Sequence, residues 1–69
     1  MPLLPHQERV VAEKADLDAK RTALNAFFGS QLFAGLDFAE QDRLRRQHAV
    51  MSEYSEILGE RIEAFRAGE

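Results

Sequence analysis

Four polar residues stand beside the apolar positions of two expected helices, and their types suggest chemistry. Pairing the helices antiparallel brings Glu13 near Arg61 and Lys20 near Tyr54. A guanidinium is a planar donor fork that suits phosphate, and a tyrosine ring can stack on a base. Two interpretations stay open. Arg61 and Tyr54 line a crevice between subunits, or Glu13 and Arg61 form a pair that fixes the helix register.

The residue set does not predict catalysis. The chain has no cysteine, and its three serines, Ser30, Ser52 and Ser55, do not form a serine–histidine–carboxylate set. The two histidines, His6 and His48, are far apart in the sequence, and no glycine-rich phosphate loop, zinc-ligand set or carboxylate pair occurs at a recognised spacing. We therefore predict a binding protein that is not an enzyme, with no metal and no cofactor.

Apolar residues at seven-residue spacing predict the two helices that must position these side chains. The first helix, about residues 6–28, carries Val10, Leu17 and Leu24, with Pro5 suited to its first turn. The second helix, about residues 38–66, carries a longer series at the same spacing: Leu44, Met51, Leu58 and Phe65. The predicted fold is therefore all-α, an antiparallel two-helix hairpin.

The connector, residues 29–37, is expected to contain a short helical turn. Gly29 and Ser30 should end the first helix, and Ser30 should also cap the turn. Asp37 and Glu40 have the form of a capping box, in which Asp37 accepts from the N–H of Glu40 and Glu40 reaches back.

Length and composition predict one domain, residues 1–69, that completes its core by self-association. A chain of 69 residues buries little apolar surface, and this one has no disulfide to supplement it. The net charge of −3 argues against binding to duplex nucleic acid. The apolar runs are too short to cross a bilayer, and the first residues do not form a secretory signal, so we predict a cytoplasmic protein without membrane contact.

Short runs along both helices resemble a known family. They are Arg9 to Lys14, Leu17-Asp18, Lys20, Leu24, Phe27, Glu40-Gln41, Arg43-Leu44, Gln47, Met51, Tyr54-Ser55, Ile57-Leu58 and Glu60 to Ile62. Together they resemble the small phage proteins with a helical hairpin that act as anti-CBASS and anti-Thoeris sponges for nucleotide signals. The resemblance covers about residues 6–65.

The resemblance implies a phage protein that sequesters a cyclic oligonucleotide immune signal, a cyclic di- or trinucleotide, without cleaving it. Members of this family look like homo-oligomers, commonly hexamers, with ligand pockets between protomers. The residues that combine suitable chemistry with a place in the matching segments are our predicted ligand contacts: Arg9, Lys14, Lys20, Tyr54 and Arg61. This chain lacks the leading segment and β-rich extension of larger members, so contacts from those segments do not carry over.

Two other functions remain open. The first is a structural oligomerisation or adaptor hairpin that binds a host protein through its exposed helix faces, and it should tolerate the loss of Arg61 or Lys20. The second is a DNA-binding protein built on the segment from Arg43 to Arg46, which ranks last because the net charge and the long helices do not suit it.

Overall fold

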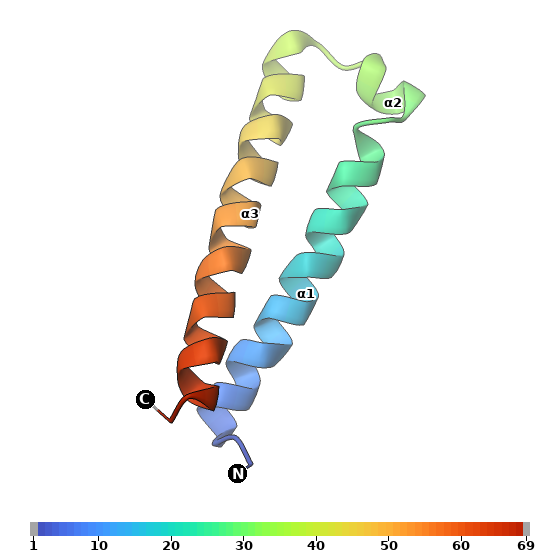
Figure 1. Cartoon of the computed structure of the whole chain (residues 1–69). Helices are drawn as coiled ribbons and strands as arrows, with labels where there is room; N and C mark the ends of the chain where they lie inside the picture. Colours follow the sequence, from blue (N-terminus) through green and yellow to red (C-terminus); the bar gives the residue numbers. More distant parts are fainter. Residues whose placement is uncertain (1, 69) are drawn as a thin grey trace.

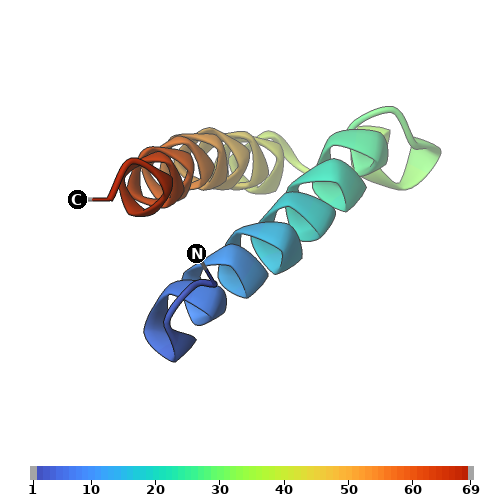
Figure 2. The ribbon, with the colours of Figure 1, turned by 60° about the horizontal axis from the view of Figure 1, so that its bottom comes forward.

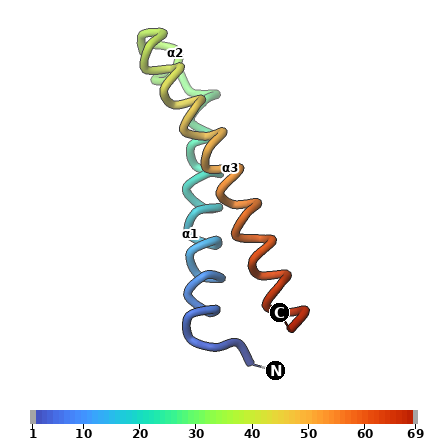
Figure 3. Tube along the Cα trace, turned by 90° about the vertical axis from the view of Figure 1, so that its left-hand side faces the viewer, coloured from blue at the N-terminus to red at the C-terminus, as the bar shows by residue number. Residues whose placement is uncertain are grey.

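Two long helices, α1 (Pro5–Phe27) and α3 (Phe38–Arg66), run antiparallel in the computed structural model, which describes residues 2–68. A short helix, α2 (Gln31–Ala34), lies at the tip of the hairpin, and the start of α1 and the end of α3 lie at the opposite end (Figure 1). The helix axes are inclined to each other (Figures 2 and 3). The prediction of an all-α fold with a helical turn in the connector is confirmed for the described residues.

Helix α1 begins and ends one residue earlier than predicted. Pro5 fills the first position, where its missing N–H costs no hydrogen bond. The side chain of Gln7 accepts from the backbone N–H of Leu4 at 2.9 Å, which is one half of a capping box. A polar side chain therefore fixes the start of α1, although the residue before Pro5 is a leucine.

Ser30 joins the end of α1 to the start of α2. Its hydroxyl donates to the carbonyl of Phe27 at 2.7 Å and accepts from the N–H of Phe33 at 3.1 Å. Gly29 does not adopt a left-handed conformation. Among the described residues, only Gly68 has a positive φ. The serine hydroxyl, rather than a left-handed glycine, thus ends α1.

Asp37 caps α3 as predicted, and its carboxylate accepts from the N–H of Glu40 at 2.8 Å. The second half of the predicted capping box is wrong. The Glu40 carboxylate accepts from Arg43 Nε at 2.8 Å and does not reach back to Asp37. A charged partner one turn ahead is a stronger donor than the neutral backbone N–H behind it.

The contact between α1 and α3 buries little apolar surface. Among the described residues, Val10, Phe33 and Leu58 are the only buried apolar side chains. Leu17, Leu24, Leu44 and Met51 are half-buried along the same contact. Cross-helix contacts pair Asp18 with Ser55 and Phe28 with His48, so the chain order along the contact is antiparallel.

The molecule is a thin rod, with principal extents of 49 × 15 × 14 Å. Its radius of gyration is 15.5 Å, whereas a globular chain of this length would have about 11 Å. Across residues 2–68, neither long helix has an apolar stretch that could cross a membrane.

Candidate functional site

A closed hydrogen-bonded triangle links the two helices near their middle. Lys14 Nζ donates to Asp18 Oδ2 at 2.7 Å and to Ser55 Oγ at 3.1 Å. The Ser55 hydroxyl in turn donates to Asp18 Oδ1 at 2.5 Å. Ser55 is only 3% exposed, and every polar atom of its side chain is satisfied. The seam between the helices is therefore polar where an ordinary hairpin would place leucine.

The triangle favours the ionised form of Asp18. The hydrogen bond from the Lys14 ammonium, followed by that from the Ser55 hydroxyl, lowers the pKa of Asp18. The positive charges of Lys14 and Arg21 lower it further, and partial desolvation opposes them. Arg21 Nη2 lies 3.5 Å from Asp18 Oδ1, so one carboxylate serves two cations.

Gly59 lies next to the lysine of the opposite helix. A Cβ atom at this position would lie 3.4 Å from Lys14 Cε, which is already van der Waals contact. The aliphatic part of Lys14 therefore passes close to the α3 backbone before its ammonium reaches Ser55.

An open hollow of about 220 Å³ lies beside the triangle, toward the tip. Arg21, Thr22 and Asn25 of α1 line it, together with His48 of α3. All four side chains can donate hydrogen bonds, and none of them is a carboxylate. Such a lining suits an anionic or strongly polar ligand.

Aromatic rings pack together on the side of the hollow that faces the tip of the hairpin. The Phe28 ring meets the His48 ring edge to face, with centroids 5.4 Å apart. Phe28 also packs on the buried Phe33 at 5.1 Å, and the Arg45 guanidinium lies 5.0 Å from the Phe33 centroid. His48 is thus positioned by packing that begins at α2.

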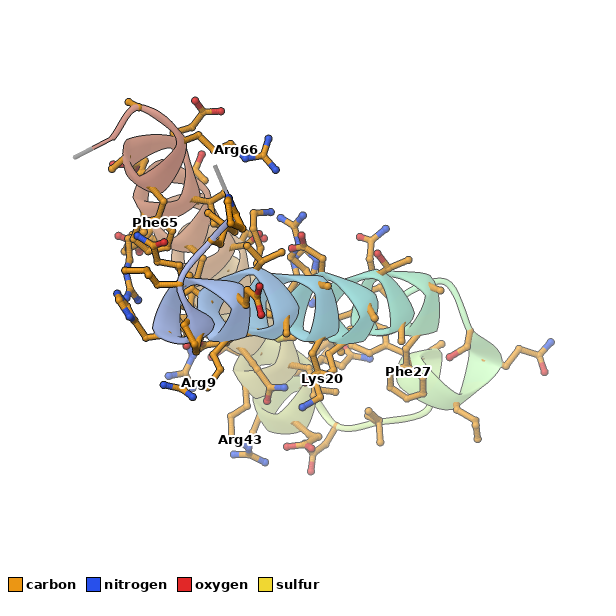
Figure 4. All side chains as sticks on the ribbon, turned by 90° about the horizontal axis from the view of Figure 1, so that it is seen from below. Arg9, Lys20, Phe27, Arg43, Phe65 and Arg66 are labelled. Carbon is orange, nitrogen blue, oxygen red and sulfur yellow. The ribbon has the colours of Figure 1, made fainter. Side chains whose placement is uncertain are left out.

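The structure brings one of the five predicted contact residues into this region. Lys14 belongs to the triangle, with 29% of its side chain exposed. Lys20 is exposed and pairs with Asp16 at 3.1 Å on its own helix. Arg9 and Lys20 project from the same side of α1 (Figure 4), and Arg9 forms no ion pair within residues 2–68.

The predicted pairing of Glu13 with Arg61, and of Lys20 with Tyr54, is wrong. Glu13 and Arg61 are both exposed, and no ion pair joins them in the described chain. Tyr54 is 40% exposed and makes no side-chain hydrogen bond among residues 2–68. These residues lie one position before the residues that face the other helix, which turns them about 100° away from it.

Sequence reasoning missed the residues that do meet between the helices. Each of these residues lies four positions after an apolar residue of the contact. On α1, Lys14 follows Val10 and Arg21 follows Leu17. On α3, His48 follows Leu44 and Ser55 follows Met51. The polar pairs proposed from sequence used a step of three instead. Both steps leave a residue near one helix face, so spacing alone did not choose between them.

No three histidine, aspartate or glutamate side chains converge as a metal site within residues 2–68. Arginine and asparagine around the hollow instead offer hydrogen-bond donors, which favour phosphate or a polar ring over a cation.

Comparison with known proteins gives one finding. No curated protein and no solved structure matches the chain. A family model described as Sequestin matches residues 4–64, a range that includes α1, α2, the triangle and the hollow. Because this match covers most of the chain, the protein belongs to the Sequestin family.

Proposed function

We propose that this protein is a phage anti-defence protein that sequesters cyclic oligonucleotide immune signals. It holds a cyclic di- or trinucleotide in the cytoplasm of the infected bacterium and so blocks CBASS-type immunity. Membership of a family named for sequestering supports this function. The observation that carries it is the donor-lined hollow between α1 and α3.

The hollow supplies the groups that a phosphodiester needs. Arg21 offers a planar fork of donors at its edge, and one of its nitrogens, Nη2, lies 3.5 Å from Asp18 Oδ1. Thr22 and Asn25 add a hydroxyl and an amide, which can bind ribose hydroxyls or base edges. His48 presents a flat ring on the opposite wall. A cyclic nucleotide combines these same features, namely phosphate, hydroxyls and flat bases.

One chain does not enclose such a ligand. Ligand pockets that bury most of a small molecule measure roughly 300–1,000 Å³, whereas this open hollow measures about 220 Å³. The binding unit we propose is therefore a homo-oligomer in which a second chain closes the hollow. The families that the chain resembles suggest six copies.

The proposed protein binds its ligand without cleaving it. Ser55, the one serine hydrogen-bonded to both a lysine and a carboxylate in the described chain, resembles an activated nucleophile in its contacts. It is buried at 3% exposure between the helices, however, so a phosphodiester would have to separate α1 from α3 to reach it. The triangle is better suited to fixing the hairpin.

The five residues predicted from sequence remain a second set of proposed contacts. Arg9, Lys20, Tyr54 and Arg61 are exposed and lie outside the hollow, so they can meet a ligand only on the outer surface or at an interface between copies. The two sets separate cleanly by mutation, because they share no residue.

Isothermal titration of the purified protein with a panel of cyclic di- and trinucleotides tests the function. We expect submicromolar binding to at least one member. Ligand released by heating should be intact on chromatography. Arg21→Gln should weaken binding by about tenfold or more, because it removes a charged donor without removing the side chain.

Lys20→Gln is the matched control, since it removes one cation from the same helix outside the hollow. Binding lost in this control but kept in Arg21→Gln would move the site to the residues predicted from sequence. Hydrolysed ligand would overturn sequestration. Absence of heat with every nucleotide would reject the function and favour the adaptor hairpin.

A further inference from the structure

Helix α3 carries a second apolar face that is left exposed in the part of the chain that the structure describes. Val50, Tyr54 and Ile57 lie on this face, and we call them the outer band. Val50 is 65% exposed and Ile57 is 48% exposed. Each member of the band comes one residue before a residue of the interhelical seam, Met51, Ser55 or Leu58. The band therefore lies about 100° around α3 from the seam.

The total accessible surface of the chain indicates how much area a partner would have to bury. The accessible surface is 5258 Å² for a mass of 7.8 kDa. A folded monomer of that mass would expose about 4,400 Å². The excess, about 900 Å², is close to the area of roughly 800 Å² that each partner buries in a standard protein interface. One interface of ordinary size would bring this chain to the surface expected of a stable fold.

The shape of the outer band favours a second copy of the same chain. Val50 and Ile57 are seven residues apart, which is two helical turns on one face. In an antiparallel pair of α3 helices related by a two-fold axis, Val50 of one copy meets Ile57 of the other, and the reverse contact forms at the same time. The Tyr54 rings then lie near the axis, between these two contacts.

Charges on either side of the band favour the antiparallel direction. The segment before it, residues 40–46, carries three arginines and two carboxylates, a net charge of +1, with Arg43 paired to Glu40 and Arg46 to Asp42. The segment that includes the end of the band and continues beyond it, residues 56–63, carries three glutamates and one arginine: Glu56, Glu60, Glu63 and Arg61. No ion pair within residues 2–68 uses any of these glutamates. Antiparallel pairing sets the basic segment against the acidic one, and parallel pairing sets like charges together.

We propose that two copies of this chain associate through the outer bands of their α3 helices, antiparallel and about a two-fold axis. The role of this pair within a ligand-binding homo-oligomer rests on the proposed function, but the pairing itself can be measured without any ligand. The outer band contains none of the four residues that line the hollow. The pair therefore presents two hollows that remain free for ligand or for further copies.

Sedimentation velocity of the full chain, with and without Ile57→Asp, tests the surface. We expect the parent chain to sediment as a dimer or larger species. Ile57→Asp should sediment as a monomer with its helical circular dichroism retained, because Ile57 is not buried within the chain. The matched control is Phe38→Asp, since Phe38 is 88% exposed at the tip and lies outside the band. This control should associate as the parent does.

Disulfide trapping tests the direction, and the absence of cysteine from the chain makes it clean. An equimolar mixture of Val50→Cys and Ile57→Cys should form mixed dimers on mild oxidation. Val50→Cys alone should form few, because its two copies stand about 10 Å apart along the axis.

Three results would overturn the proposal. They are a monomeric parent chain, association unchanged by Ile57→Asp, and trapping that is as efficient for Val50→Cys alone as for the mixture. A band-dependent dimer that binds no nucleotide would leave the interface standing and reject the proposed function alone.

Discussion

The tip of the hairpin packs through aromatic rings, whereas its middle is joined through charges. At the tip, Phe33 is buried against Phe27 and Phe28, with ring centroids 6.0 and 5.1 Å away. In the middle, Lys14, Asp18 and Ser55 close a polar triangle. Apolar packing depends little on direction, but hydrogen bonds require a fixed geometry. The tip thus adds apolar stabilisation, and the triangle selects one register of α1 against α3.

The tip should be the more sensitive region to truncation. Phe33→Ala removes the buried ring and should cost about 3–5 kcal/mol. A chain this small rarely has more than about 3–5 kcal/mol in total, so the variant should lose most of its helical circular dichroism at room temperature. Phe38→Ala, at an exposed ring five residues on, should change stability little. A cooperative Phe33→Ala unfolding curve near that of the parent would show that the tip adds little stability.

In the middle, Asp18→Asn should have the largest effect, because it removes the shared partner of Lys14 and Arg21. Since folding lowers the pKa of Asp18, the unfolded chain binds the proton more tightly. The stabilisation is therefore complete above about pH 4 and disappears as the pH falls through the lower pKa of the folded state. Urea unfolding between neutral and acid pH should show the parent and Asp18→Asn converging. A constant difference between them at every pH would contradict this account.

Ser55→Ala should have a smaller effect, about 1 kcal/mol, because Lys14 and Asp18 keep their direct bond and can bind water in place of the hydroxyl. Ser52→Ala serves as its control. The Ser52 hydroxyl bonds to the carbonyl of His48 within its own helix, so its loss should be close to neutral. Equal melting temperatures for the two variants would mean that the triangle contributes nothing beyond ordinary packing.

Gly59→Ala should have the smallest effect, and it should be stabilising. Alanine is favoured over glycine inside a helix by up to about 1 kcal/mol. The added methyl would meet Lys14 Cε at 3.4 Å, a contact that a flexible side chain can accept. We expect the melting temperature to rise by a few degrees. A fall would show that the triangle holds the lysine too rigidly to move.

The sequence was sufficient to predict the helices and the apolar half of their contact. Seven-residue spacing identified Val10, Leu17 and Leu24, which are buried or half-buried, and short-range chemistry identified the caps at Ser30 and Asp37. These features depend on residues within one or two turns of each other, where the rules of helix geometry leave few choices.

The polar half of the contact was not predictable by the same means. Glu13 and Lys14 are neighbours in the sequence, as are Tyr54 and Ser55, and either member of each pair could have faced the other helix. The inclination of the helix axes decides which member faces inward, and that inclination is a property of the whole contact. Ile62 could have indicated the correct spacing. It is apolar and lies four positions after Leu58, whereas Arg61, three positions after Leu58, is polar.

Tyr54 is the only tyrosine of the chain, which has no tryptophan. Its ring is partly exposed on the outer band. Tyrosine emission therefore comes from one known position, on the face where a second copy is proposed to bind. A dilution series can therefore follow association through the emission of this ring, without an added label. The concentration at which the emission changes gives the affinity of the contact at that face.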